Sequence, residues 1–365
     1  MDSIYNLATQ GVQQLVPYQA GKPIEELQRE LGLDTIVKLA SNENPLGPSP
    51  LALQAVQAVL PQLALYPDGN GFNLKHALAQ KFAVASSQIT LGNGSNDILE
   101  LIGRAFLAPG LAAVFSQHAF AVYPIVTQAV GATAVVTPAC DYGHDLQAML
   151  ANVTDKTRVV FVANPNNPTG TLLSQANLEA FIKALPDSCI CVLDEAYFEF
   201  VSHSGTIDSI SWLMDCPNLI ITRTFSKAYG LAGLRVGYAF SSPCIADILN
   251  RVRQPFNNNS LALVAAEAAL SDTVHLQQTL VNNGQGMQQL TEGFKHLDLN
   301  WIPSSGNFVA VDLNRPGLPI YQALLHKGVI VRPVANYGLP NHLRISIGTA
   351  EENSLFLNAL ADCLS

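Results

Sequence analysis

The chain has 365 residues, of which 48% are hydrophobic and 13% are charged, and its formal net charge at pH 7 is −9. A chain of this length and apolar content is expected to fold around a large core with a second, smaller unit, which excludes disordered and fibrous proteins. The acidic charge balance also argues against a nucleic-acid partner.

The six cysteines and eight histidines are scattered, without the short spacings typical of zinc sites or disulfide frameworks. We therefore assign no metal. The N-terminus has no apolar run after a basic start, and no stretch is long enough to span a bilayer. These features predict a cytoplasmic protein with no membrane partner.

Residues 1–47 are loosely patterned, and we expect them to form an N-terminal arm and connector. They contain a helical pattern over residues 24–31 and a strand-like run over residues 35–39. The turn-forming residues at 41–50 then stop any helix. Two further helical patterns follow at residues 51–60 and 73–82.

From residue 89 to residue 240, short apolar runs alternate with helical patterns. The runs predict seven strands, at residues 89–91, 111–115, 132–137, 159–163, 190–193, 219–221 and 236–240. Most are apolar throughout, as is typical of parallel strands that are covered on both faces. Helical patterns at residues 98–106, 122–129 and 178–185 complete an α/β doubly wound pattern, in which ligands bind beyond the carboxyl ends of the strands.

After residue 255 the pattern changes to long helices, at residues 261–270 and 274–297, followed by strands at residues 308–312, 329–332 and 343–347. Thr349 and Glu352 then form the signature of a capping box that opens a last helix. We therefore predict a large domain over residues 48–255 and a smaller α+β domain over residues 256–365.

A lysine lies just beyond the predicted strand at 219–221, in the sequence RTFSKAYGLAGLRVG of residues 223–237. Thr224, Ser226 and Arg235 flank Lys227, so its amine is expected beside a small anion held by two hydroxyls and a guanidinium. These groups suit a phosphate-bearing aldehyde cofactor that bonds covalently to the amine. The alternative is a surface lysine in a polar turn, which the glycines and apolar residues of this segment disfavour.

Polar residues follow other strands of the predicted sheet. Asp194 comes directly after the strand at 190–193, and Tyr197 lies three residues further on. A carboxylate here can pair with a protonated ring nitrogen, with an attraction on the order of 4 kcal/mol at about 4 Å and an effective dielectric near 20. The phenol of Tyr197 and the amide of Asn167 can bond a ring oxygen. The alternatives are a helix cap at Asp194 and an ordinary Asn-Pro turn at Asn167.

Two weaker signals of a cofactor site lie earlier in the chain. Ser95 and Asn96 lie at a helix start after a glycine-containing turn, where free backbone amides suit a phosphate. Phe120 opens a helix and can stack on a planar ring, although core packing is the commoner role of phenylalanine.

Seven segments together resemble the fold-type-I pyridoxal-phosphate aminotransferases, and within them the histidinol-phosphate aminotransferases. They are KLASNENP (38–45), YPD (66–68), GNGSN (92–96), ANPNNPTG (163–170), LDEAY (193–197), RTFSK (223–227, continuing to Arg235) and LRISIG (343–348). They cover nearly the whole chain. The resemblance implies a large domain with a seven-stranded, mostly parallel sheet and a smaller α+β domain.

The resemblance also implies roles for individual residues around pyridoxal 5'-phosphate. Lys227 would bond the aldehyde and move protons, and Asp194 would hold the ring nitrogen. Tyr197 and Asn167 would bond the ring oxygen, and Phe120 would stack on the ring. The phosphate would be held by Ser95, Asn96, Thr224, Ser226 and Arg235. Tyr66 would reach the phosphate from a neighbouring subunit, which implies a homodimer with shared active sites.

For the substrates, the resemblance implies that Arg344 binds the carboxylate of glutamate or the phosphate of histidinol phosphate, with Arg332, Tyr18 and Asn167 nearby. The expected reaction exchanges the amino group between L-histidinol phosphate and 2-oxoglutarate in histidine biosynthesis, where it yields imidazole-acetol phosphate and L-glutamate. An aromatic amino acid aminotransferase and a phospho-amino-acid decarboxylase of the same fold remain alternatives. A non-enzymatic alternative is a cofactor-sensing regulator of the same fold, which would need an attached DNA-binding module. The segment before residue 41 is short and acidic, so we do not expect it to form such a module.

The proposed roles of the Lys227 amine predict the effect of replacing this residue with alanine. Lys227→Ala should keep the fold and the grip on the phosphate but lose turnover, because the amine has two chemical roles. Transamination assays on the purified variant measure this. Full activity would refute the assignment.

Overall fold

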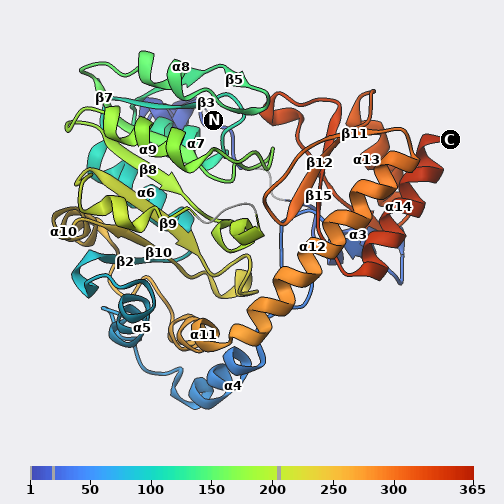
Figure 1. The fold of residues 1–365 in the computed structure, drawn as a ribbon, viewed down its shortest axis with the longest axis horizontal. Coiled ribbons are helices and arrows are strands. Elements are labelled where there is room, and N and C mark those ends of the chain that lie inside the picture. Colours follow the sequence, from blue (N-terminus) through green and yellow to red (C-terminus); the bar gives the residue numbers. More distant parts are fainter. Residues whose placement is uncertain (1, 19–20, 204–206) are drawn as a thin grey trace.

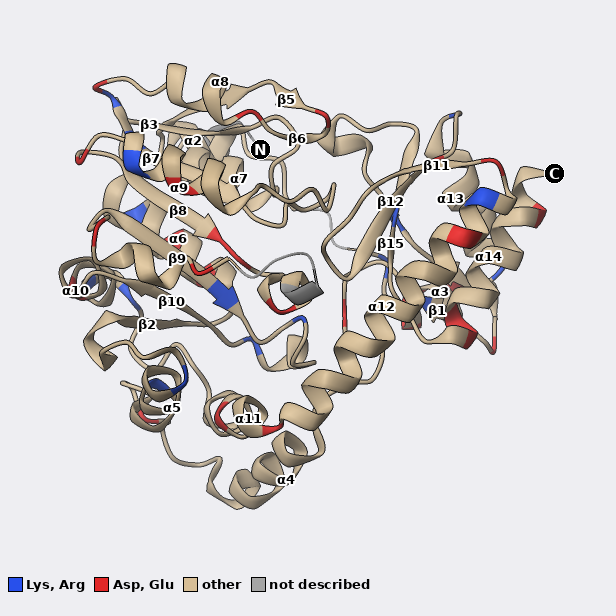
Figure 2. Ribbon diagram, viewed as in Figure 1, with Lys and Arg blue, Asp and Glu red and all other residues tan. Residues whose placement is uncertain are grey.

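The structure is a computed structural model that describes residues 2–18, 21–203 and 207–365. Residues 1, 19 and 20 of the predicted arm and residues 204–206 of the predicted large domain lie outside the described residues. Figure 1 shows two parts, each with its own sheet, joined by a long helix. Lysine and arginine residues are interspersed with aspartate and glutamate over both parts (Figure 2).

The larger sheet has seven strands in the order β2-β10-β9-β8-β7-β3-β4. Its strands are β2 (Ile89–Gly92), β3 (Ala112–Ser116), β4 (Thr133–Thr137), β7 (Thr157–Ala163), β8 (Ile190–Asp194), β9 (Leu219–Thr224) and β10 (Gly237–Ser241). All neighbouring strands are parallel except β10, which is antiparallel to both β2 and β9. The seven predicted strands and the α/β fold class are confirmed.

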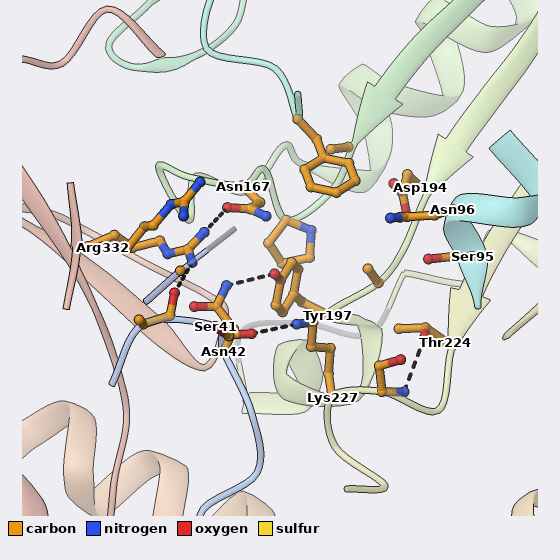
Figure 3. A pocket seen from close by; sticks show the side chains of 18 of the residues that line it. Ser41, Asn42, Ser95, Asn96, Asn167, Asp194, Tyr197, Thr224, Lys227 and Arg332 are labelled. Carbon is orange, nitrogen blue, oxygen red and sulfur yellow. Dashed lines mark hydrogen bonds between the residues drawn. The ribbon is translucent and has the colours of Figure 1, made fainter. Parts of the chain in front are cut away.

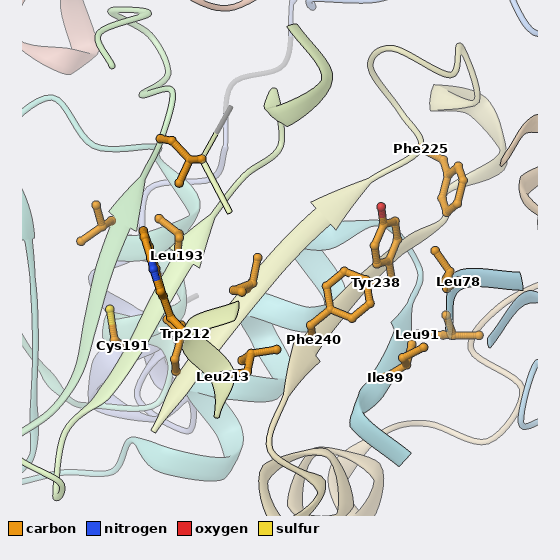
Figure 4. Packing of buried hydrophobic residues seen from close by; sticks show 14 of the residues in the cluster. Leu78, Ile89, Leu91, Cys191, Leu193, Trp212, Leu213, Phe225, Tyr238 and Phe240 are labelled. Carbon is orange, nitrogen blue, oxygen red and sulfur yellow. The ribbon is translucent and has the colours of Figure 1, made fainter. Parts of the chain in front are cut away.

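Both faces of this sheet are buried except at the edge strand β4, where Thr133, Ala134 and Val136 are exposed. In β7, Val160 and Val162 point into one cluster while Val159 and Phe161 point into another. This alternation follows from the two-residue period of a strand. Figure 4 shows part of the first cluster, in which Tyr238 and Phe240 of β10 lie near Leu78. Apolar runs without polar alternation therefore marked strands covered on both sides.

Helices cover the two faces. On the face of the first cluster lie α5 (Phe72–Phe82), α8 (Leu146–Ala151), α9 (Gln175–Ala184) and α11 (Ser260–Ser271), with α4 (Pro50–Val59) packed on α11. On the other face lie α6 (Ser95–Phe106), α7 (Val122–Ala129) and α10 (Pro243–Val252). The short 3-10 helices are η1 (Leu60–Gln62), η2 (Ser86–Gln88), η3 (Phe198–His203), η4 (Ile210–Leu213), η5 (Ala232–Leu234) and η6 (Ala335–Tyr337).

The smaller sheet has the order β11-β12-β15-β14, formed by β11 (Asn300–Ile302), β12 (Phe308–Asp312), β15 (His342–Ser346) and β14 (Arg332–Pro333). It packs with α12 (Thr273–His296), α13 (Gly317–His326) and α14 (Ala350–Leu364) around a separate core. In Figure 1, α12 extends from the end of α11 to this sheet. The capping box at Thr349 is present, because its hydroxyl accepts from the Glu352 N–H and the Glu352 carboxylate accepts from the Thr349 N–H.

The predicted strand at residues 329–332 is divided in two. Its first part, β13 (Val329–Ile330), pairs in parallel with β1 (Val37–Lys38), whereas β14 pairs with β15. The chain therefore changes sheets at residue 331. The predicted strand at 35–39 shortens to β1 for the same reason, since only two of its residues meet β13.

The N-terminal segment contains three helices, α1 (Asp2–Tyr5), α2 (Gln10–Gln13) and α3 (Ile24–Leu31). Elsewhere, between β4 and α8, a small antiparallel hairpin is formed by β5 (Ala139–Cys140) and β6 (Gly143–His144). The boundaries of the three predicted domains stay a prediction. The helix α11 follows the proposed boundary at 255, yet its side chains Ala262, Ala265 and Ala266 belong to the core of the large sheet. Among the described residues, no helix has the length and apolar character that a membrane span requires.

Candidate active site

A pocket lies where the carboxyl ends of β7, β8 and β9 face the small sheet and residues 40–42. Its lining consists of Tyr18, Gly21, Ala40, Ser41, Asn42, Ser95, Asn96, Phe120, Ala163, Pro165, Asn167, Asp194, Ala196, Tyr197, Thr224, Ser226, Lys227, Arg235, Arg332 and Arg344. Every site residue predicted from the sequence is in this set except Tyr66. The pocket is shown in Figure 3.

Lys227 lies in the turn after β9, and its Nζ donates to the backbone carbonyl of Ser41 at 2.9 Å. Burial lowers the pKa of the Lys227 amine to about 7, and the positive charge of Arg344 acts in the same direction, while Glu43 opposes it. A lysine with this pKa has a large neutral fraction at neutral pH. Neutral amines are nucleophiles, so this side chain is prepared for covalent bonding to an aldehyde.

Asp194 ends β8 and is 4% exposed. Tyr123 donates its hydroxyl to Oδ2 at 2.8 Å, and Thr222 donates to Oδ1 at 3.1 Å. Burial raises the pKa of Asp194, while these two hydrogen bonds act in the opposite direction. A carboxylate held in this way by both oxygens presents a fixed negative charge to a cationic group in the pocket.

A buried ion pair lies one residue further along the same two strands. Arg223 and Glu195 are 1% and 3% exposed at their side chains, and Arg223 Nη2 lies 2.8 Å from Glu195 Oε2. Their neighbours in the chain are Thr222 and Asp194. Because a buried pair of this kind requires both partners, it holds the ends of β8 and β9 together beside the carboxylate.

Tyr197 and Asn167 face the pocket from different segments. Asn42 donates its Nδ2 to the Tyr197 hydroxyl at 2.8 Å. Burial raises the pKa of Tyr197 to about 12, so the phenol stays protonated at neutral pH. Arg344 donates to Oδ1 of Asn167, which leaves the amide nitrogen as the end of Asn167 that is available to a ligand. Both side chains thus supply donors to an oxygen in the pocket.

Five residues form what we call the anion cup: Ser95, Asn96, Thr224, Ser226 and Arg235. The first two begin helix α6, whose free N–H groups favour negative charge. Arg235 Nη1 donates to the Ser226 hydroxyl at 3.2 Å. A Cβ at Gly94 would lie 2.2 Å from Arg235 Nη2, so the guanidinium crosses the turn only because this residue is glycine.

Arg332 and Arg344 are partners in the register of β14 and β15, and both line the pocket. Arg344 Nη2 donates to the carbonyl of Ala40 at 2.7 Å, whereas its buried Nε has no hydrogen-bond partner within the described part of the chain. The Arg332 guanidinium lies 5.7 Å from the centre of the Tyr18 ring. Two adjacent guanidinium groups suit a carboxylate or a phosphate ester.

The two remaining predicted residues differ in position. Phe120 lines the pocket and meets the Tyr123 ring edge to face, with ring centres 5.9 Å apart. Tyr66 lies outside the pocket, is 82% exposed and stacks on Phe256 with ring centres 4.8 Å apart. Its predicted role in a neighbouring subunit stays a prediction.

Sequence reasoning missed four residues that shape the site: Ser41, Asn42, Tyr123 and Thr222. Asn42 is held by Ser346, whose hydroxyl accepts from the Asn42 N–H at 2.7 Å. The segment SNENP was noted as a motif but interpreted as a turn or connector, so a signal for Asn42 was present. Tyr123 and Thr222 carry no such signal, because each lies within a helix or strand and its role depends on the contact with Asp194.

Comparison with known proteins gives the family. The description "Aminotransferase class I and II" fits residues 34–360 of the sequence. This chain belongs to that aminotransferase family. The family predicted from the motifs is confirmed.

This aminotransferase is 62% identical to a Pseudomonas fluorescens protein named histidinol-phosphate aminotransferase 2, over 98% of each chain. It is 60% identical to a Pseudomonas aeruginosa protein of the same name, over 100% of each chain. It also resembles the crystal structure of histidinol-phosphate aminotransferase from Sinorhizobium meliloti in complex with pyridoxal-5'-phosphate. The TM-score is 0.91 at 31% identity, and the match covers 98% of this chain and 97% of that chain.

The lowered pKa of Lys227 gives a pH prediction for this aminotransferase. The amine is charged below about pH 7 and neutral above it, so the rate at which the cofactor-free protein captures pyridoxal phosphate should rise through about pH 7 and then level off. Stopped-flow absorbance measures this rate, with pyridoxal as a phosphate-free comparison. Arg344→Gln removes a positive charge and should move the midpoint to higher pH. A midpoint near pH 10, the range of an ordinary lysine, would contradict the account.

Proposed function

We propose that this aminotransferase exchanges the amino group between L-histidinol phosphate and 2-oxoglutarate, as a step of histidine biosynthesis, with pyridoxal 5'-phosphate as cofactor. The observation that carries the proposal is the convergence of an amine of lowered pKa, a buried carboxylate and two arginines in one pocket. Relatives about 60% identical over the full length bear the corresponding name.

The residues present fit this cofactor. The anion cup supplies three hydroxyls, the side-chain amide of Asn96, a guanidinium and a helix N-terminus for the phosphate. Asp194 supplies a fixed negative charge for the ring nitrogen. Tyr197 and Asn167 supply donors for the ring oxygen, and Phe120 supplies an aromatic face. When bound, pyridoxal phosphate supplies an electron sink that acidifies the amine-bearing carbon of the substrate.

Lys227 has two tasks under this proposal. At rest its amine would hold the cofactor, and during the reaction the freed amine would accept the proton that leaves the amine-bearing carbon of the substrate and would donate a proton to that carbon in the reverse direction. A pKa of about 7 suits both directions of transfer at neutral pH. The carbonyl of Ser41, 2.9 Å from Nζ, orients the amine toward the pocket.

Arg344 and Arg332 would bind the anionic end of each substrate. The Nε of Arg344, which has no acceptor among the described residues, is a buried donor that a phosphate or carboxylate oxygen would satisfy. In one half-reaction this oxygen belongs to the phosphate of histidinol phosphate, and in the other to a carboxylate of 2-oxoglutarate. Tyr18, whose ring lies near Arg332, adds a hydroxyl at the mouth of the pocket.

We also propose that the chain works as a homodimer with shared active sites. Large apolar side chains are exposed between α4 and the start of α5, including Leu63 at 57%, Leu65 at 69%, Tyr66 at 82% and Phe72 at 70%. Exposed large apolar side chains that are close together in the chain favour a protein interface. A second copy seated there would bring Tyr66 toward a neighbouring pocket.

The six cysteines carry free thiols, which suits the reducing cytoplasm as the location.

The substrate proposal is tested by a half-reaction on the cofactor-loaded protein. Histidinol phosphate should convert the aldehyde form to the amine form with a higher kcat/KM than phenylalanine or threonine phosphate. Arg344→Gln should lower this value roughly 100-fold, because a charge-assisted pair is lost. Arg251→Gln, a change at an exposed arginine on α10, is the control. Faster reaction with phenylalanine, or decarboxylation of threonine phosphate, would contradict the proposal.

The dimer is tested by Leu63→Asp. A charge among these exposed apolar side chains should convert the dimer to monomers in sedimentation and lower activity. Leu355→Asp on α14, at a leucine that is 47% exposed, is the matched control and should remain dimeric. A monomeric wild-type protein would sink the proposal, as would a dimeric Leu63→Asp variant.

A further inference from the structure

The segment RQPFNNN, residues 253–259, links α10 to α11 and passes beside the anion cup. We call it the asparagine loop. Its side chains bond three other segments: the turn at 66–71, the turn between β2 and α6, and the turn that precedes Arg235. Each of these segments carries a residue proposed to bind the cofactor phosphate.

Two asparagines hold the turn that leads to Ser95. Asn258 donates its Nδ2 to the carbonyl of Gly92 at 2.7 Å and is 4% exposed. Asn257 donates its Nδ2 to the Asp97 carboxylate at 2.7 Å. The same carboxylate oxygen accepts from the N–H of Asn93 at 2.8 Å. The turn is therefore fixed at both ends by the asparagine loop.

The third asparagine holds the other half of the cup. Asn259 donates its Nδ2 to the carbonyl of Leu234 at 3.0 Å, immediately before Arg235. Arg235 has a left-handed backbone with φ of 57°. The two halves meet closely, because a Cβ at Gly237 would lie 2.5 Å from the Ser95 nitrogen. A shift of either turn would therefore change the distance between the donors at the start of α6 and the guanidinium of Arg235.

The same loop supports Tyr66. Arg253 Nη2 donates to the carbonyl of Gly69 at 2.8 Å, and the Phe256 ring stacks on Tyr66 at an interplanar angle of 25°. Phe256 is 46% exposed and has a φ of 57°, which is unfavourable for a bulky side chain. An exposed phenylalanine in a strained backbone contributes little to a core. Its evident contact is the ring of Tyr66.

We propose that the asparagine loop is the positioning element for the cofactor phosphate. Asn257, Asn258 and Asn259 fix the two halves of the anion cup within one subunit, while Arg253 and Phe256 aim Tyr66 at the cup of the neighbouring subunit. The loop acts through these residues and does not itself contact the cofactor. This inference rests on the cofactor and the dimer proposed above, and it is independent of the amine substrate.

The first test compares two ligands of the cofactor-free protein, pyridoxal phosphate and pyridoxal, which lacks the phosphate. Asn258→Ala should weaken pyridoxal phosphate binding about tenfold and leave pyridoxal binding within about twofold, because only the cup is loosened. Asn218→Ala is the matched control. Asn218 is also a buried asparagine that donates to a backbone carbonyl at 2.7 Å, but it lies at the amino end of β9.

Equal losses for both ligands, or no loss of pyridoxal phosphate affinity, would overturn the proposal. A change in the ratio of the two affinities in Asn218→Ala would also overturn it, because it would show that general destabilisation is sufficient. Since no amine substrate is present, a failure of the histidinol phosphate proposal would leave these results unaffected.

The second test uses the exposed Phe256, where substitution leaves the core intact. Phe256→Ala should weaken pyridoxal phosphate binding severalfold, and Phe256→Tyr should retain the wild-type affinity because the ring is kept. In a Tyr66→Ala background, Phe256→Ala should have no further effect, since the ring acts through Tyr66. Additive losses in the double variant would contradict this part of the proposal.

Discussion

The site depends on keeping an amine, a carboxylate and several cations together in a buried space. Burial disfavours each charged form, so the pKa of Lys227 falls and the pKa of Asp194 rises. The protein resolves the conflict differently for the two groups. Within the described residues the lysine donates to a single backbone acceptor, which favours the neutral nucleophile. The carboxylate receives hydroxyl donors on both oxygens, which favours the anion.

This arrangement requires segments that are far apart in the sequence. Strand β1 pairs with β13, which leads directly into β14 of the small sheet, and Asn307 donates to the carbonyl of Asn42 at 3.0 Å. Residues 40–42 are thereby fixed as a wall between the two sheets. The wall places an acceptor at Lys227 and a donor at Tyr197. The N-terminal segment is therefore part of the active site as well as a connector.

Much of this was predictable, for a physical reason. Parallel strands buried on both faces are apolar, so polar residues at their carboxyl ends, such as Asp194 and Asn167, stand out in the sequence. The fold pattern then places those ends at one edge. The seven large-sheet strands and the polar pocket residues that follow them were found in this way, with Arg344, Arg332 and Tyr18 supplied by the family resemblance.

What was missed depends on contacts that have no local pattern. Asn42 gains its role from Ser346, about three hundred residues away, and Tyr123 gains its role from the side chain of Asp194. The division of residues 329–332 between two sheets depends on the choice of partner strand. The asparagine loop resembles an ordinary polar turn until its carbonyl acceptors are known. For Tyr66 the sequence predicts a contact with a second chain, which the structure of a single chain does not contain.

The central claim is that the amine of Lys227 is the group that bonds the cofactor. Borohydride reduction of the purified protein, followed by peptide mapping in a mass spectrometer, tests it most directly. The account predicts a stable pyridoxyl-phosphate adduct on the peptide that contains Lys227, and none elsewhere. An adduct on another lysine, or no adduct in protein that carries the cofactor, would contradict it.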